Sequence, residues 1–306
     1  MNIVSTSPSG TEILCALGVD PVAVSHACDY PPRVTDLPSI DFSRVRGESS
    51  AERHDRVRTV SAEGTVYRLD VETLRNAEPD LILSQEVCGV CAVDTTLVDE
   101  VLTDLDGDPE VVGLHANRLE DLFSCIERVG SAVGREKRAR ELNTELRERL
   151  DEIETRVKGL DRPRVAIFEW LDPLIVAGNW VPELVEITGG EYGLAAPGDR
   201  TVEVEWDDVI EYDPEVLVAA PCGFSTDRTL ARAEELTARS GWNELSAVRS
   251  GRAYAMDGAS YFNRWSPRLI EATERLATCC HPGAFGTPPD DVVALPRTSQ
   301  QTGQSI

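Results

Sequence analysis

Short runs of apolar residues alternate with segments of helical periodicity along most of the chain. Residues 3–5 predict a buried strand, and the segment 12–17 that follows has the spacing of a helix. The same order returns in the second half, where 165–168 predicts a strand and 181–187 predicts a helix. Strands that alternate with helices in both halves predict an α/β fold with two Rossmann-like lobes, each built on a parallel sheet.

A long amphipathic helix is expected between the two halves. Apolar positions recur at helical spacing over residues 136–157, and nearly all of the other positions there are charged. At 1.5 Å per residue such a helix extends about 30 Å, enough to join two lobes as one rigid rod. The polar segment 37–65 is poorly periodic and is expected to be mostly loop. The expected domains are an N-terminal lobe at 1–117, connecting helices at 118–160, a C-terminal lobe at 161–286 and a disordered tail at 287–306.

The charge balance narrows the partners. The chain has 30 basic and 54 acidic residues, a net charge of −24, which repels phosphate backbones and anionic membrane surfaces. Nucleic acid is therefore not expected as a partner. Lys137 and Lys158 are the only lysines, a composition that suits solvation at high salt and indicates a halophilic source, with a codon bias toward arginine as the alternative.

The chain shows no apolar run long enough to cross a bilayer and no leader-like segment before its first strand. No membrane insertion is expected. The expected location is cytoplasmic for the chain as written, and extracytoplasmic if the true N-terminus is longer. The eight cysteines are not spaced like a disulfide scaffold, so packed thiols, metal ligands or redox groups are the expected roles.

Aromatic and polar residues follow the predicted strands. In open α/β sheets ligands bind beyond the carboxyl ends of the strands, so these residues are expected to line a cleft that holds a large, partly apolar ligand. The alternatives are ordinary core aromatics for the tryptophans and a braced turn for Tyr30 before two prolines. The candidate ligand contacts are Ser7, Tyr30, Glu86, Trp170, Trp180, Phe224, Tyr261 and Trp265.

Four thiols and one imidazole form a second candidate set. Cys88 and Cys91 have CxxC spacing, which lets two sulfurs reach one metal ion, and His26 with Cys28 follows a neighbouring strand. Cys222 follows a strand of the other lobe. A metal or corrinoid-ligand site, a redox pair and structural thiols all remain open for this set.

The sequence lacks the motifs of common enzyme classes. It has no G-x-S-x-G elbow, no phosphate loop of the G-x-x-x-x-G-K-[ST] type and no G-x-G-x-x-G after a strand. The protein is therefore expected not to be an enzyme. A nucleophile at Cys88 or Cys222, with His26 as its base, is the remaining catalytic alternative.

Four short motifs carry a resemblance to a known family. The opening from Ile3 to Glu12 resembles a strand followed by S-P-x-x-T-E, and Asp29-Tyr30-Pro31-Pro32 resembles D-Y-P-P. Glu78 to Ile82 resembles K-P-D-L-I, and Ser266-Pro267-Arg268 resembles the S-P-R that begins the last helix. In this order they resemble the helical-backbone substrate-binding proteins of iron-siderophore and cobalamin ABC transporters, in the cobalamin branch, over residues 2–282.

The resemblance implies a protein that holds cobalamin or an iron-siderophore-like chelate in the cleft between two lobes, linked to uptake through an ABC permease. A monomer is expected. Carried over by position, Tyr30, Trp170, Trp180 and Trp265 become ligand contacts. Two departures, the missing leader and the cysteine set, keep open a cytoplasmic protein that handles a metal or corrinoid through Cys28, Cys88, Cys91 and His26.

Overall fold

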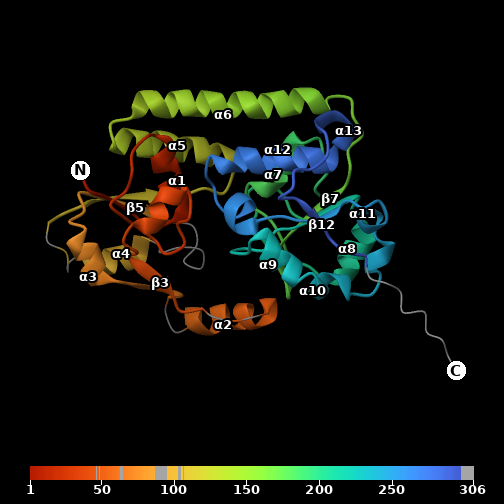
Figure 1. Cartoon of the computed structure of the whole chain (residues 1–306), viewed down its shortest axis with the longest axis horizontal. Helices are drawn as coiled ribbons and strands as arrows, with labels where there is room; N and C mark the ends of the chain where they lie inside the picture. Colours follow the sequence, from red (N-terminus) through yellow and green to blue (C-terminus); the bar gives the residue numbers. More distant parts are fainter. Residues whose placement is uncertain are drawn as a thin grey trace. The chain divides into compact units, whose positions relative to one another are not determined.

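The computed structural model (Figure 1) describes residues 1–45, 47, 49–62, 65–86, 95–102, 105 and 107–297. The chain forms two compact units. The first unit contains Met1–Asp151 and, from much later in the sequence, Arg264–Ile270. The second unit contains Glu152–Asn263 and the residues from Glu271 onward. The first unit is therefore completed by a segment that belongs to the second half of the sequence.

The first unit is built on a four-stranded parallel sheet in the order β2-β1-β5-β6. Val4 of β1 and Ile82 of β5 lie opposite each other on neighbouring strands, so their side chains face the same hydrophobic core. Helices cover the sheet, and a separate antiparallel pair, β3 and β4, packs beside that core. The strands are β1 (Ile3–Ser5), β2 (Ala23–Val24), β3 (Asp41–Ser43), β4 (Tyr67–Leu69), β5 (Leu81–Gln85) and β6 (Glu110–Leu114). The helices are α1 (Pro8–Ala16), η1 (Pro32–Asp36), α2 (Ser50–Ala62), α3 (Val71–Asn76), α4 (Thr95–Leu102) and α5 (Leu119–Ala132).

The expectation that residues 37–65 are mostly loop is wrong. This segment contains β3 and the 13-residue helix α2. Most α2 positions are polar or charged, and Val57 and Val60 pack it against the core beside Ile40. Two apolar contacts are too few to give a readable helical period, which is why the pattern missed the helix.

The second unit carries a six-stranded sheet in the order β12-β11-β10-β7-β8-β9. The centre is parallel, as predicted, but β8, β9 and β12 are antiparallel to their neighbours. The chain reverses at Asp172-Pro173, so β8 folds back on β7 as a hairpin instead of following through a helix. The strands are β7 (Val165–Leu171), β8 (Leu174–Val176), β9 (Val202–Glu203), β10 (Val216–Ala219), β11 (Ala253–Ala255) and β12 (Val293–Ala294).

The helices of the second unit are mostly short. The predicted helix at 181–187 is α7 (Val181–Ile187). The others that lie wholly in this unit are α8 (Trp206–Tyr212), α9 (Thr226–Ala231), α10 (Glu234–Thr237), η2 (Trp242–Glu244), α11 (Ser246–Arg249), η3 (Gly258–Phe262) and α13 (Pro282–Phe285). Two longer helices, α6 (Glu136–Val157) and α12 (Arg268–Cys280), contain the points where the chain passes from one unit to the other.

The described part of the segment expected to be a disordered tail contains a strand, β12, and a buried leucine. β12 pairs with β11, and Leu295 is buried in the core of the second unit. The indole Nε1 of Trp242 donates to the carbonyl oxygen of Pro296 at 3.1 Å. Strand pairing, the buried Leu295 side chain and a satisfied indole therefore fix residues that looked like a polar terminus in the sequence.

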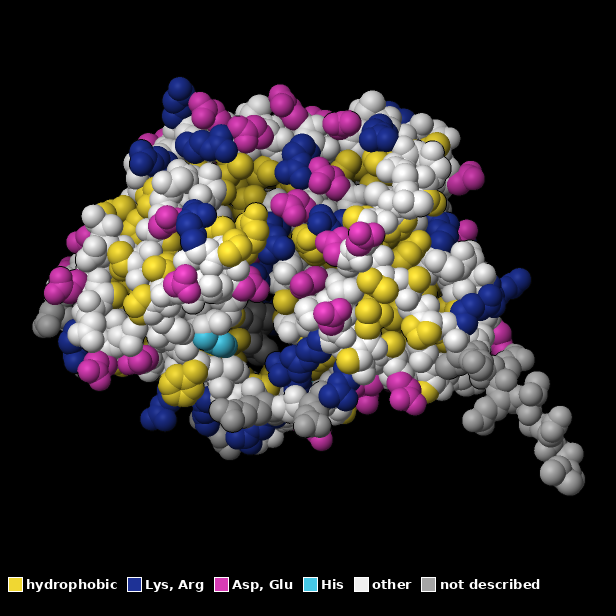
Figure 2. Space-filling view, in the orientation of Figure 1, with side chains coloured by type: hydrophobic (Ala, Val, Ile, Leu, Met, Phe, Trp, Pro, Cys, Tyr) yellow, Lys and Arg dark blue, Asp and Glu magenta, His cyan; other side chains and the backbone are white. Residues whose placement is uncertain are grey.

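The α/β fold with two lobes that the sequence predicts is confirmed, and α6 has the predicted bounds. Among the described helices, none combines the length and the apolar character needed to cross a bilayer. Acidic side chains are scattered over the face shown in Figure 2.

Candidate functional site

The loop after β2 is fixed by the buried carboxylate of Asp41. His26 donates its backbone N–H to Asp41 Oδ1 at 2.7 Å, and its ring nitrogen Nδ1 lies 2.8 Å from the same oxygen. The Ser25 hydroxyl donates to Asp41 Oδ2 at 2.8 Å. Asp41 comes from β3, so the two-stranded sheet holds the beginning of this loop.

A buried arginine fixes the other end of the same loop. Arg264 donates through Nη1 to Asp29 Oδ1 at 2.5 Å and through Nη2 to Asp29 Oδ2 at 3.2 Å, a two-pronged pairing. Nη2 also donates to the carbonyl oxygen of Ala27 at 3.2 Å. Arg264 thereby binds both the backbone and the side chain of the loop.

Glu12 of α1 forms a buried ion pair with Arg264. Its Oε1 accepts from Arg264 Nη1 at 3.0 Å, and its Oε2 accepts from the Ser266 hydroxyl at 2.6 Å. Glu12 is 4% exposed and Arg264 is 8% exposed. The three side chains connect a helix of the N-terminal sequence to a segment 252 residues later.

Burial and charge compete in this cluster. Burial raises the pKa of Glu12, and the charges of Arg264 and Arg268 with the Ser266 hydrogen bond oppose this only in part. Burial alone would lower the pKa of Arg264, but Asp29 and Glu12 outweigh it and raise that pKa. Arg264 therefore stays charged, and the carboxylates of Glu12 and Asp29 both stabilise its charge.

Tyr30 is the most exposed aromatic among the candidate contacts. Tyr30 follows Asp29 in sequence and is 41% exposed. The guanidinium carbon of Arg268 lies over the Tyr30 ring, 4.4 Å from the ring centroid. This is the geometry of a cation–π contact, which holds the ring from one face. A tyrosine fixed in this way and still open to solvent is ready to stack on a ligand.

The other candidates of the first unit differ in exposure. Glu86 follows β5 and is exposed, and a Cβ at Gly113 would overlap its carboxylate, so the glycine makes room for it. Ser7 is fully buried as the N-cap of α1, where its hydroxyl accepts from the Gly10 N–H. Trp265 is buried, at 3% exposure. Ser7 and Trp265 support the loops instead of facing solvent.

In the second unit two of the candidate aromatics, Trp170 and Phe224, pack against each other. Phe224 is fully buried, its ring lies 5.5 Å from that of Trp170 edge-to-face, and the Arg228 guanidinium covers it at 4.0 Å. Trp170 is only partly buried, as is Cys222, which follows β10. These residues come together at the carboxyl ends of β7 and β10, as the sequence predicts.

Trp180 and Tyr261 are occupied by structural contacts. The Trp180 indole is buried and donates to the carbonyl oxygen of Phe262 at 2.9 Å. The Tyr261 hydroxyl donates to Asp291 Oδ2 at 3.1 Å, while the Arg275 guanidinium lies 4.3 Å from the centre of its ring. Both side chains brace the η3 segment and the C-terminal strand.

The described residues give no support for a metal site. No group of three or more His, Cys, Asp or Glu side chains among them is arranged to hold an ion. Burial raises the pKa of Cys28 to about 12, and its sulfur lies 3.2 Å from the Thr11 hydroxyl, so it is a packed thiol and not a thiolate ligand. Cys88 and Cys91 lie outside the described residues.

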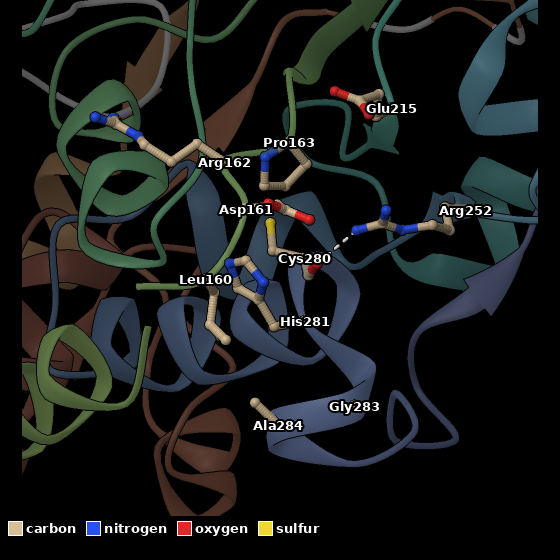
Figure 3. Close-up of a pocket in the computed structure, with 10 residues that line it drawn as sticks. All are labelled: Leu160, Asp161, Arg162, Pro163, Glu215, Arg252, Cys280, His281, Gly283 and Ala284. Carbon is tan, nitrogen blue, oxygen red and sulfur yellow. Dashed lines mark hydrogen bonds between the residues drawn. The ribbon is translucent and has the colours of Figure 1, made fainter. Parts of the chain in front are cut away.

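A cavity of about 430 Å³ lies at the amino ends of the strands of the second sheet (Figure 3). It sits before β7, β10 and β11, away from the strand-end residues described above. Arg252 caps the end of α12 through the carbonyls of Cys279 and Cys280, and His281 binds the Thr188 carbonyl. The cavity is lined by Leu160, Asp161, Arg162, Pro163, Glu215, Arg252, Cys280, His281, Gly283 and Ala284. Because Arg252 and His281 already bind backbone carbonyls, we assign these two side chains of the cavity a structural role.

Sequence reasoning missed the Glu12–Arg264–Asp29 cluster. Glu12 reads as the third residue of a capping box with Ser9, but Ser7 is the actual N-cap and Glu12 turns to Arg264 instead. One signal was available: a single arginine in the aromatic-rich segment 261–265 needs a partner if that segment is buried.

Comparison with known sequences places this architecture among binding proteins. A family model described as periplasmic binding protein matches residues 3–259. The uncharacterized ABC transporter substrate-binding lipoprotein YvrC of Bacillus subtilis is 27% identical over 292 residues, covering 92% of this chain and 81% of that protein. The vitamin B12-binding protein of Vibrio parahaemolyticus is 24% identical over 284 residues, covering 91% of this chain and 88% of that protein.

Solved structures share the fold. A periplasmic heme-binding protein from Pseudomonas aeruginosa superposes with a TM-score of 0.73 at 21% identity, covering 97% of this chain and 99% of the other. At this identity the likeness establishes the two-lobed α/β architecture.

Proposed function

This chain belongs to the periplasmic binding protein family, and from that premise we propose that it is the substrate-binding protein of an ABC transporter. Members of this family bind a solute, so the chain is a binding protein and not an enzyme. The proposal includes an ABC permease as its partner and an extracytoplasmic location, in line with the lipoprotein relative.

The proposed ligand is a corrinoid of the cobalamin type. Similarity to the vitamin B12-binding protein extends over 91% of this chain, and the D-Y-P-P segment at residues 29–32 fits the same branch. The observation that carries the proposal is Tyr30: the residue is 41% exposed, in a loop that the buried Arg264 holds in place. A preorganised aromatic surface binds a macrocycle with little loss of conformational entropy.

We propose as ligand contacts the candidate residues that keep some exposed surface. In the first unit these are Tyr30 and Glu86, which are exposed, and in the second Trp170 and Cys222, which are partly buried. The buried members of the candidate set have a supporting role in this proposal. Phe224 packs against the Trp170 ring, and the buried Trp265 is the neighbour of Arg264 in sequence.

Ligand titration tests this proposal. Cyanocobalamin, hemin and a ferric hydroxamate siderophore are titrated separately into the protein by calorimetry, at low and at molar salt. Saturable heat with cyanocobalamin is the expected result. Saturation with hemin or the siderophore alone replaces the corrinoid by that ligand, and no heat with any of the three contradicts a chelate-binding function.

Variants of one strand and its loop localise the binding. Tyr30→Ala is expected to weaken cyanocobalamin binding about tenfold, because loss of a stacked aromatic contact is worth about 1–1.5 kcal/mol. Tyr30→Phe keeps the ring and should bind normally. Val22→Ala, which truncates an exposed side chain just before β2 at the other end of that strand, is the matched control. Equal effects of Tyr30→Ala and Val22→Ala would remove Tyr30 from the site.

A further inference from the structure

The loop that carries Tyr30 has no regular structure of its own between β2 and η1. Side chains from outside the loop hold Ala27 to Tyr30: Arg264 binds Ala27 and Asp29, and Arg268 covers Tyr30. Both arginines belong to the segment Arg264–Ile270, which joins the first unit from the second half of the sequence.

We infer that Arg264 is a positioning residue for ligand binding, which fixes the loop through Asp29 so that the Tyr30 ring stands ready for the ligand. The inference rests on the proposed function. Arg264 is itself buried at 8% exposure, so it acts through the loop and not by touching the ligand.

Three features of the cluster support this role over a purely stabilising one. The pairing with Asp29 uses both carboxylate oxygens, which fixes direction as well as distance. The Asp29 side chain is 53% exposed, so a stabilising pair alone would gain little from it. The buried carboxylate of Glu12 also pairs with Arg264 Nη1, which fixes the guanidinium on the side away from the loop.

Asp29→Ala is the variant of choice, because it releases the loop without leaving a buried charge unpaired: Arg264 keeps Glu12. In ligand-free protein, amide hydrogen exchange between His26 and Val34 is expected to accelerate about tenfold. The control is Asp80→Ala, which removes another exposed carboxylate of the first unit, at the amino end of β5. Unchanged exchange in Asp29→Ala overturns the inference.

A double-mutant cycle separates positioning from general damage. With cyanocobalamin or hemin as the probe, Asp29→Ala is expected to weaken binding about five- to tenfold when Tyr30 is present. In the Tyr30→Ala background the same change should weaken binding less than about twofold, because the ring it positions is gone. Equal losses in both backgrounds overturn the inference.

The two proposals fail in different ways. If cyanocobalamin, hemin and the ferric siderophore all fail to bind the unaltered protein, the proposed function fails, and the exchange measurement still decides whether Arg264 and Asp29 hold the loop. If a probe binds and Tyr30→Ala weakens it while Asp29→Ala changes neither exchange nor affinity, the proposed function stands and the positioning role is overturned.

Discussion

The strand-end loops of the two units use opposite means to hold aromatic side chains. In the first unit, charged groups fix the loop backbone and leave the Tyr30 ring open to solvent. In the second unit, aromatic rings pack against each other and against arginines, so that Phe224 is fully buried and Trp170 partly exposed. The difference shows that an aromatic residue after a strand stays open to solvent only where other groups hold the loop around it.

The largest effect should come from the buried ring of the second unit. Phe224→Ala is expected to destabilise that unit by about 3–5 kcal/mol, because it leaves a cavity between Trp170 and Arg228. Tyr30→Ala should cost only about 0.5–1 kcal/mol, the worth of an exposed cation–π contact. Hydrogen exchange in peptides of each unit measures both, and similar losses would erase the contrast between the two loops.

The charged cluster is expected to come next. Arg264→Met should destabilise the first unit by about 3–5 kcal/mol, because it leaves the buried Glu12 with only the more distant Arg268 at 3.8 Å as a cation. The double variant Arg264→Met with Glu12→Met should recover most of this loss, since removing both buried charges is often neutral. Arg138→Ala, at an exposed pair with Glu145 on α6, is the control and should cost less than about 1 kcal/mol. No recovery in the double variant would mean that packing, not charge, makes the cluster important.

Trp170 offers a smaller and more specific test. Trp170→Ala is expected to weaken cyanocobalamin binding about three- to tenfold with little loss of stability, since the ring is partly exposed. Trp206→Ala is the control, because this partly exposed indole of the same unit lies on α8 and donates to Ser240. A stability loss as large as that of Phe224→Ala, with unchanged affinity in the folded protein, would assign Trp170 to the core.

The smallest expected effect concerns pH. His281 is buried, and burial lowers its pKa below the ordinary value of 6.5, although the Thr188 carbonyl opposes this. The unfolded chain therefore binds a proton at His281 more readily than the folded protein does. This contribution to the stability of the second unit is complete above about pH 6.5 and is lost as the pH falls below that value. His281→Gln should flatten this slope in unfolding midpoints measured between pH 5 and 8. An unchanged slope would show that other groups cause the acid sensitivity.

Periodicity predicted much of the fold. The apolar run of β1 and the heptad-like spacing of α6 each point to one structure, and both were confirmed. The helix α2 was missed because two apolar contacts carry no period, and the β7–β8 hairpin because β8 has only three residues. Local pattern predicts an element only where the element buries a regular stripe of its own.

The candidate site was predictable by location but not by role. The sequence places Tyr30 and Trp170 after strands, and the structure leaves both partly exposed there. Trp265 has the same sequence context but is buried. The partner of Arg264 is 252 residues away, and no local pattern encodes a contact at that separation. Cys88 and Cys91, the sharpest local motif, lie outside the described residues, so their role stays a prediction.

The late docking of Arg264–Ile270 has a consequence for biosynthesis. A chain emerging from the ribosome presents Glu12 about 250 residues before its arginine, which at about 5–20 residues per second is a wait of roughly 10–50 s. During that interval α1 and the loop at Asp29 lack their partner. A chain ended before residue 264 should therefore have a first unit without the arginine that pairs with Glu12 and Asp29.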